Sequence, residues 1–222
     1  MGWRLNLTYS ACFAVFLLSA FVFLLWRDRM QKRSPLAFRQ VKLFGFPCSA
    51  RQVVELPRDN SDLDQVLSGG YLPGQVARDV RRTLRDVVVL IFLCVLMFVA
   101  TAAMAAESFA PHQDRVFGLL AQTAMAAGVA AGLENMSIRR ALDAAAEDVQ
   151  RDRATPIRRW SLIKWALMAL LAMVTPVLLL YSEGKTGGRV FMACVTAFLL
   201  FPFGAYCAHL LAMWWHTPGA RW

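Results

Sequence analysis

Five long runs of this chain contain no Asp, Glu, Lys or Arg and are dominated by apolar side chains. They cover residues 9–26, 87–106, 116–133, 165–181 and 190–215, which are 18, 20, 18, 17 and 26 residues long. A helix needs about 17–25 apolar residues to cross a bilayer. The runs do not alternate as barrel strands do, so helices are the remaining way to satisfy their backbone in lipid. The pattern predicts an all-α, polytopic membrane helix bundle with five transmembrane helices.

Composition supports the same class of protein. Hydrophobic residues make up 58% of the 222-residue chain, whereas soluble domains contain about 45–50%. The five cysteines are isolated from one another, and their spacing suits neither a zinc site nor a redox pair. We therefore expect neither a metal nor a cofactor.

The basic residues are distributed unevenly between the two sides of the predicted membrane. Lys and Arg number 12 in residues 27–86, 7 in residues 134–164 and 1 after residue 215, against 4 on the other side. Cytoplasmic loops carry the excess of positive charge in multi-pass proteins. This predicts an N-out, C-in orientation, and the Arg- and Ala-rich composition favours a bacterial inner membrane.

The predicted spans divide the chain into six segments. The first run precedes the basic stretch "RDRMQKR" rather than a small-residue cleavage site, so it is interpreted as a reverse signal-anchor rather than a signal peptide. Short outer turns join spans two and three into one hairpin and spans four and five into another. The segments are a signal-anchor span (1–26), a basic cytoplasmic loop (27–86), the first hairpin (87–133), a cytoplasmic helical extension and linker (134–164), the second hairpin (165–215) and a cytoplasmic tail (216–222).

The cytoplasmic segments contain signals for further elements. Residues 50–57 are predicted to form a short strand, and residues 60–67 a short helix capped by Asn60 or Ser61. A helix that opens at Pro73 is expected to continue directly into the second span. No Pro or Gly interrupts residues 133–154, so the third span is predicted to extend into the cytoplasm as one helix from about Val116 to about Ala154. Thr155 and Pro156 supply the expected stop.

Small residues line one face of this long helix. Gly128 and Gly132 form a G-x-x-x-G pattern, which permits close helix approach in lipid. The stripe is a candidate packing or partner interface, and it faces either the other spans of the chain or another subunit. Asn135 is its most informative position, because a polar residue on an apolar seam is satisfied by a like residue across a symmetric contact. The stripe comprises Ala124, Gly128, Ala131, Gly132, Asn135, Ile138 and Leu142.

Few residues within the runs offer chemistry. His209 is the one ionisable group inside a run, apart from Cys and Tyr, and all 15 acids lie outside the runs. An intramembrane His is a functional hypothesis, and here it has no acid or second His at its depth. No catalytic motif is present, so no catalytic residue is assigned and an enzyme is disfavoured. His209, Gln122 and Thr123 form a possible intramembrane polar site, and Gln122, Thr123 and Thr196 are the small polar side chains expected to line an oligomeric pore. Pro176 and Pro202 are interpreted as packing kinks rather than broken helices.

The remaining signals concern partners. Arg27, Arg29, Lys32 and Arg33 follow the first span directly, so they are expected to contact lipid headgroups. No nucleic-acid partner is expected, because the positive charge serves topology first. We expect a non-catalytic interaction or scaffold subunit of a larger membrane assembly, of a secretion, conjugation or exclusion type, with other membrane subunits or its own copies as partners. The alternatives are an oligomeric channel or small-solute transporter and, more remotely, a membrane enzyme that uses His209.

Overall fold

Five long helices dominate the described part of the chain, and all five are long and apolar enough to cross a membrane. The computed structural model describes residues 9–38, 40–43, 46–57, 59–68, 75–107, 112–146, 152–181 and 187–215. The long helices are α1 (Tyr9–Arg33), α4 (Gln75–Glu107), α5 (Gln113–Ala146), α6 (Ala154–Tyr181) and α7 (Gly187–Trp215). The prediction of five long apolar helices is therefore confirmed, and five such helices indicate a multi-pass membrane protein.

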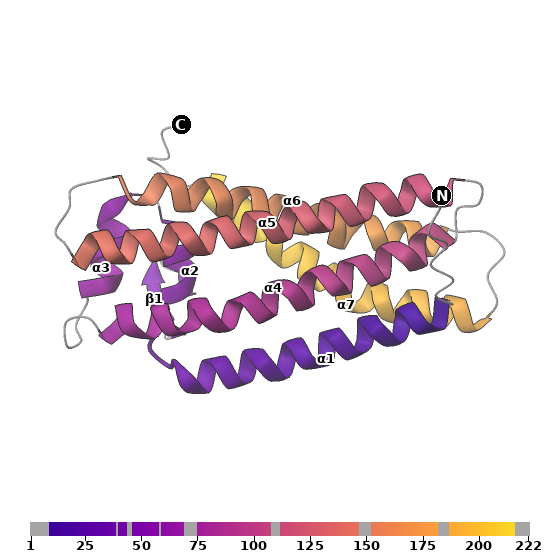
Figure 1. The fold of residues 1–222 in the computed structure, drawn as a ribbon, viewed down its shortest axis with the longest axis horizontal. Helices are drawn as coiled ribbons and strands as arrows, with labels where there is room; N and C mark the ends of the chain where they lie inside the picture. Colours follow the sequence, from indigo (N-terminus) through magenta and orange to yellow (C-terminus); the bar gives the residue numbers. More distant parts are fainter. Residues whose placement is uncertain are drawn as a thin grey trace.

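The long helices run side by side along the longest axis of the molecule (Figure 1). Each packs chiefly on its neighbour in the sequence, in the order α1, α4, α5, α6 and α7, and α4 also contacts α6. Short connections favour this up-and-down arrangement, because consecutive helices are then antiparallel neighbours. Helices α6 and α7 continue through Pro176 and Pro202, so neither proline breaks its helix.

Four short elements between α1 and α4 form what we call the insert. They are β1 (Gln40–Leu43), β2 (Phe46–Ser49), α2 (Ala50–Glu55) and α3 (Asn60–Ser68). The strands form an antiparallel hairpin in which Gln40 pairs with Ser49 and Leu43 with Phe46. The insert lies at one end of the bundle (Figure 1), which we call the insert end.

The segment 50–57, expected to be a strand, contains helix α2 instead. Val53 and Val54 are adjacent in the sequence and both almost fully buried, whereas neighbouring residues of a strand point to opposite faces. Arg51 and Glu55 also pair one helical turn apart, with 2.8 Å between Nε and Oε1. The helix thus places two valines against the bundle and keeps one ion pair within its own length.

Helix α5 follows the prediction of a long third helix at its start but not at its end. It continues without interruption from Gln113 to Ala146, past the end of the apolar run at residue 133. Residues 147–151 lie outside the described part. Asp152 and Arg153 are not helical and Ala154 begins α6, so the expected continuation to Ala154 and stop at Thr155 and Pro156 were wrong. Pro156 lies in the first turn of α6, where its missing N–H breaks no helical bond.

The start of α6 is capped from two places in the chain. The carboxylate of Asp152 accepts the backbone N–H of Thr155 at 3.1 Å. The Oδ1 atom of Asn60 accepts the N–H groups of Arg153 and Ala154 at 2.9 and 3.2 Å. Asn60 was one of two residues expected to cap α3, but it is Asp59 that accepts the N–H of Asp62 at 3.1 Å. Asn60 therefore joins the insert to a helix 94 residues later.

Apolar clusters fill the bundle along its length. The cluster at the insert end joins Val53, Val54 and Leu63 of the insert to Val80 of α4 and Ile157 of α6. Each of these side chains is at most 2% exposed, and burying one from water contributes about 2 kcal/mol. The insert is therefore packed onto the bundle as part of one core.

Candidate functional site

Four charged side chains are buried together where the insert meets the bundle. Arg51 and Glu55 come from α2, Glu134 from α5 and Lys164 from α6. Their side chains are between 3% and 13% exposed. Thr83 of α4 and Ser161 of α6 complete what we call the ionic cluster. Lys164 lies ten residues into α6, so the cluster is about 15 Å from the first residue of that helix.

The bundle side of the cluster is an ion pair between α5 and α6. The Nζ atom of Lys164 lies 2.5 Å from Oε2 of Glu134. The other carboxylate oxygen of Glu134 accepts a hydrogen bond from the hydroxyl of Ser161. Lys164 also lies over the ring of Trp165, 4.4 Å from its centroid. Both oxygens of this buried carboxylate therefore have donors, as a charge removed from water requires.

The insert side of the cluster reaches the same lysine. Oε2 of Glu55 lies 3.6 Å from Nζ of Lys164, and Oε1 accepts from Nε of Arg51 at 2.8 Å. The guanidinium of Arg51 also donates to the hydroxyl of Thr83, and Ser161 contacts the backbone carbonyl of Glu55. Helices α2, α4, α5 and α6 are thus joined at one point.

The charges of the cluster balance, with two carboxylates and two cations. Burial by itself raises the pKa of the Glu55 carboxyl, but the neighbouring charges of Lys164 and Arg51 outweigh burial and hold the pKa below its ordinary 4.5. Glu55 therefore stays ionised at neutral pH. A balanced and hydrogen-bonded set of this kind adds little net stability, but removing one member leaves another charge buried alone.

No sequence pattern predicted this cluster. Glu134 and Lys164 were treated as the boundaries of apolar runs, since each lies directly beside one. The structure instead buries both inside the bundle, at 2% and 6% exposure. The sequence does contain one signal of this ion pair. Glu134 follows the third run and Lys164 precedes the fourth, so two opposite charges lie on the same predicted side of the membrane.

Most of the small-residue stripe on α5 packs within the chain itself. Five of its members are at most 8% exposed: Ala124, Ala131, Asn135, Ile138 and Leu142. A Cβ atom added to Gly128 would lie 2.7 Å from Cγ2 of Val95 on α4, so glycine permits this close approach. Gly132 differs, because a Cβ atom there would meet nothing within 4 Å. An added methyl group at Gly132 would therefore meet no described neighbour within the chain.

Asn135 is buried without a hydrogen-bond partner among the described residues. Both Nδ2 and Oδ1 are inaccessible to solvent, and neither makes a hydrogen bond in the described part of the chain. The residues that cover Asn135 belong to the same chain. A pairing of Asn135 with its mate in a second copy stays a prediction, and it requires the covering helices to move apart.

The residues of the possible polar site do not converge. His209 lies on the exposed side of α7 and Gln122 on the exposed side of α5. The hydroxyl of Thr123 donates to the carbonyl of Leu119 within its own helix, at 2.7 Å. Helices α5 and α7 begin at the same end of the bundle (Figure 1), so Gln122 and His209 differ in depth by about 20 Å. Within one chain they form no common site.

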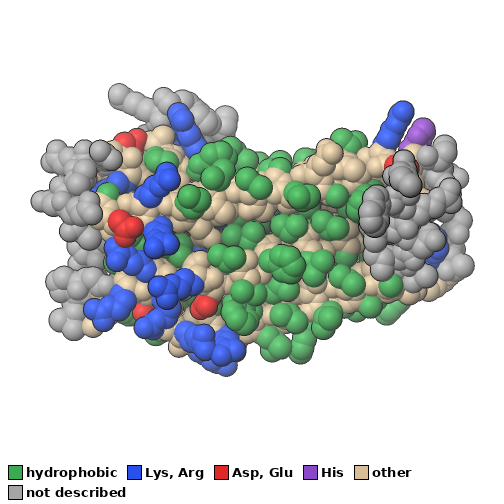
Figure 2. Space-filling view, in the orientation of Figure 1, with side chains coloured by type: hydrophobic (Ala, Val, Ile, Leu, Met, Phe, Trp, Pro, Cys, Tyr) green, Lys and Arg blue, Asp and Glu red, His purple; other side chains and the backbone are tan. Residues whose placement is uncertain are grey.

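The four basic residues after the first span lie on the exposed surface of α1. Arg27, Arg29, Lys32 and Arg33 are all exposed, and Lys32 pairs with Asp28 at 2.6 Å. Lys and Arg side chains gather over the insert end, beside a broad hydrophobic surface (Figure 2). Their predicted contact with headgroups is therefore sterically open.

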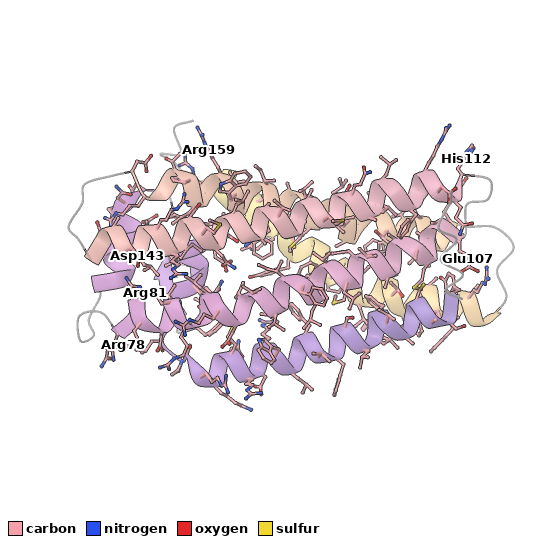
Figure 3. All side chains as sticks on the ribbon, viewed as in Figure 1. Arg78, Arg81, Glu107, His112, Asp143 and Arg159 are labelled. Carbon is pink, nitrogen blue, oxygen red and sulfur yellow. The ribbon has the colours of Figure 1, made fainter. Side chains whose placement is uncertain are left out.

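Further ion pairs hold the two ends of the bundle. Arg81 of α4 and Asp143 of α5 lie side by side at the insert end (Figure 3), with 2.9 Å between Nη2 of Arg81 and Oδ1 of Asp143. At the opposite end, where Figure 3 labels Glu107, that carboxylate pairs with Arg189 of α7 at 2.6 Å. These pairs are partly exposed, so each contributes at most about 1 kcal/mol.

Among the described residues no three His, Cys, Asp or Glu side chains lie close enough together to hold a metal ion. The chemistry that the site offers is therefore that of paired charges and hydrogen bonds. Comparison of the chain with protein-family models, with curated proteins and with solved structures finds no match.

Proposed function

We propose that this protein is a non-catalytic subunit of a larger membrane assembly, and that the insert presents a fixed surface to its partners. The insert end lies in the cytoplasm, the N-terminus outside and the C-terminus inside, in a bacterial inner membrane. The partners are other membrane subunits or further copies of the chain. A secretion, conjugation or exclusion system is the kind of assembly that we expect.

The attachment of the insert by the ionic cluster carries this proposal. An apolar contact alone would hold the insert, and apolar residues would be at least as stabilising as buried charges. Buried charged groups differ in demanding one geometry, since a shift of α2 separates Glu55 from Lys164 and Arg51 from Thr83. An insert held in one orientation serves recognition by a partner.

The proposed orientation in the membrane is supported by the distribution of charge. Basic side chains gather at the insert end (Figure 2), and positive charge marks the cytoplasmic side of multi-pass proteins. Exposed cations there include Arg78 and Arg82 of α4 and Arg139 and Arg140 of α5. The same end therefore carries both the insert and the charge excess.

One observation favours the alternative of a small-solute transporter. Glu134 and Lys164 are titratable groups inside a membrane bundle, and transporters place such groups along their substrate paths. In this protein the pair is balanced and its carboxylate is fully hydrogen-bonded. That arrangement suits a permanent structural contact better than a group that exchanges its partner for a substrate.

Mass measurement after gentle purification tests the proposal. The protein is extracted in a mild detergent, its mass is compared with 24.8 kDa for one chain, and co-purifying proteins are identified. We expect a complex that Gly132→Leu disrupts and Gly118→Leu does not. Both glycines lie on α5 with nothing within 4 Å of an added Cβ atom, so the control matches the variant in size and helix.

The transporter alternative predicts a different result. A monomer that carries solute across liposome membranes, and loses this flux with Glu134→Gln while remaining folded, would replace the proposed function.

A further inference from the structure

The exposed side of α4 changes character within one helical turn. From the insert end its exposed residues are first basic and then apolar, at the spacing of one helix face. These are Arg78, Arg81, Arg82, Arg85, Val88 and Phe92. Val88 is 61% exposed and Phe92 67%. The change at Arg85 and Val88 marks the level at which the helix passes from water into lipid.

Helix α1 shows the same change beside it. Its exposed apolar residues Phe21, Leu24 and Leu25 are each more than half exposed, and the exposed cations from Arg27 onward follow them. Two contacts fix the register of α1 against α4. The indole N–H of Trp26 donates to the carbonyl of Asp86 at 3.0 Å, and Arg82 donates to the carbonyl of Arg33 at 3.2 Å.

Two arginines lie within one helical turn of Trp26 and Asp86 along their own helices. Arg29 lies over the Trp26 ring, 5.7 Å from its centroid, and Arg85 directly precedes Asp86 in α4. Both are exposed. Within the described ranges no acid pairs with either of them, whereas Lys32 and Arg81 have carboxylate partners. These two guanidinium groups are therefore available to an external anion.

The surroundings of the two arginines carry an excess of positive charge. Residues 27–33 and 78–86 contain eight Lys and Arg but only three Asp. An anionic ligand is favoured here, and a guanidinium binds phosphate oxygens through two parallel hydrogen bonds. Because apolar side chains continue directly below the arginines, the ligand that fits both parts is amphipathic.

We propose that the seam between α1 and α4 is a binding site for one anionic phospholipid of the surrounding membrane. Arg29 and Arg85 bind its phosphate, and Arg33 and Arg82 add positive charge. The acyl chains lie along Leu25, Val88 and Phe92. A zwitterionic phospholipid fits less well, since its own cation would lie among the arginines. The site requires only the membrane-spanning helices and not the proposed role in an assembly.

The test measures lipid binding by the full chain reconstituted in phosphatidylcholine. Phosphatidylglycerol is added, and bound lipid is counted by native mass spectrometry while the unfolding temperature is followed. We expect saturable binding of one phosphatidylglycerol that stabilises the protein. Arg29→Gln/Arg85→Gln should weaken binding by at least about tenfold. The matched control is Arg139→Gln/Arg140→Gln, two exposed cations of α5, which should bind as the native chain does.

Three outcomes would overturn the site. Equal loss of binding in both double variants would indicate diffuse attraction rather than a seam. Equal stabilisation by phosphatidylcholine would remove the preference for an anionic lipid, and displacement by inorganic phosphate at the same concentration would make the ligand a free anion. Should the Arg29 and Arg85 variant not fold, a photoactivatable phosphatidylglycerol on the native chain decides instead. Its label must fall on α1 and α4 near Leu25 and Val88, and labelling elsewhere contradicts the proposal.

Discussion

The ammonium of Lys164 lies 2.5 Å from the carboxylate of Glu134, deep between α5 and α6. Through Glu55 the same ammonium also holds the insert. One lysine thus connects two membrane helices with a segment that precedes it by about 100 residues.

Lys164→Met should destabilise the protein by about 3–5 kcal/mol, because Glu134 and Glu55 then share a buried site with one cation fewer. The double variant Glu134→Leu/Lys164→Met should recover much of that loss, since the pair is replaced by apolar groups of similar volume. Unfolding free energies of the single and double variants in mild detergent check the expectation. Equal stability of Lys164→Met and the native protein would show that the cluster does not restrain the fold.

Acidification should loosen the insert through Glu55. Its pKa is lowered on folding, so its contribution to stability is complete above about pH 4.5 and is lost as the pH falls through the lowered value. The groups that face it are Arg51, Lys164 and, across the lysine, Glu134. Hydrogen exchange of α2 between pH 7 and pH 3 should show the loss, and Glu55→Gln should reduce its pH dependence. An unchanged pH dependence in that variant would assign the effect to another group.

Gly128→Ala should destabilise the bundle by about 1–3 kcal/mol, the usual cost of overpacking. The new methyl group would lie 2.7 Å from Val95, and Val95→Ala should relieve the clash in the double variant. Gly132→Ala should be tolerated by the isolated chain. Thermal unfolding in detergent distinguishes the two glycines, and comparable losses at both would mean that Gly132 also packs within the chain.

Asn60→Ala should open the start of α6 and cost about 1 kcal/mol, as the loss of a helix cap does. Asn60→Asp keeps the accepting oxygen and should retain most of the stability. Hydrogen exchange at the amides of Arg153 and Ala154 reports the change locally. Protection that survives Asn60→Ala would show that Asp152 alone caps the helix.

Hydropathy was sufficient to predict the five long helices, because a run of about 20 apolar residues has the length of a helix that crosses a bilayer. Hydropathy was insufficient to predict the ionic cluster. Glu134 directly follows one uncharged run and Lys164 directly precedes another, so both were interpreted as the ends of membrane spans. A charged residue beside an apolar run is either solvated or buried against a partner, and the choice depends on tertiary packing. The partner Glu55 comes from another segment, and no local pattern points to it.

The short elements of the insert were also predicted incompletely, because local sequence does not determine their packing. Residues 50–55 have adjacent valines and an i, i+4 ion pair that suit a helix, but six residues are too few for periodicity to outweigh β-branched composition. Asn60 was correctly identified as a capping residue type and was assigned to the wrong helix. Asn60 is the first residue of α3, and only the fold decides whether its side chain accepts N–H groups of that helix or of another.

The long separation between Glu55 and Lys164 also bears on the order in which the protein is made. While only α1, α4 and α5 have been synthesised, Glu134 and Glu55 have no lysine between them, and Asn60 has no helix to cap. The contacts of the insert with α6 therefore form only when α6 emerges, more than 80 residues after the insert was translated. In the proposed orientation the insert lies in the cytoplasm during that interval, without its contacts to α6. A chain truncated after α5 should consequently be captured by quality-control proteases, even though three of its membrane helices are complete.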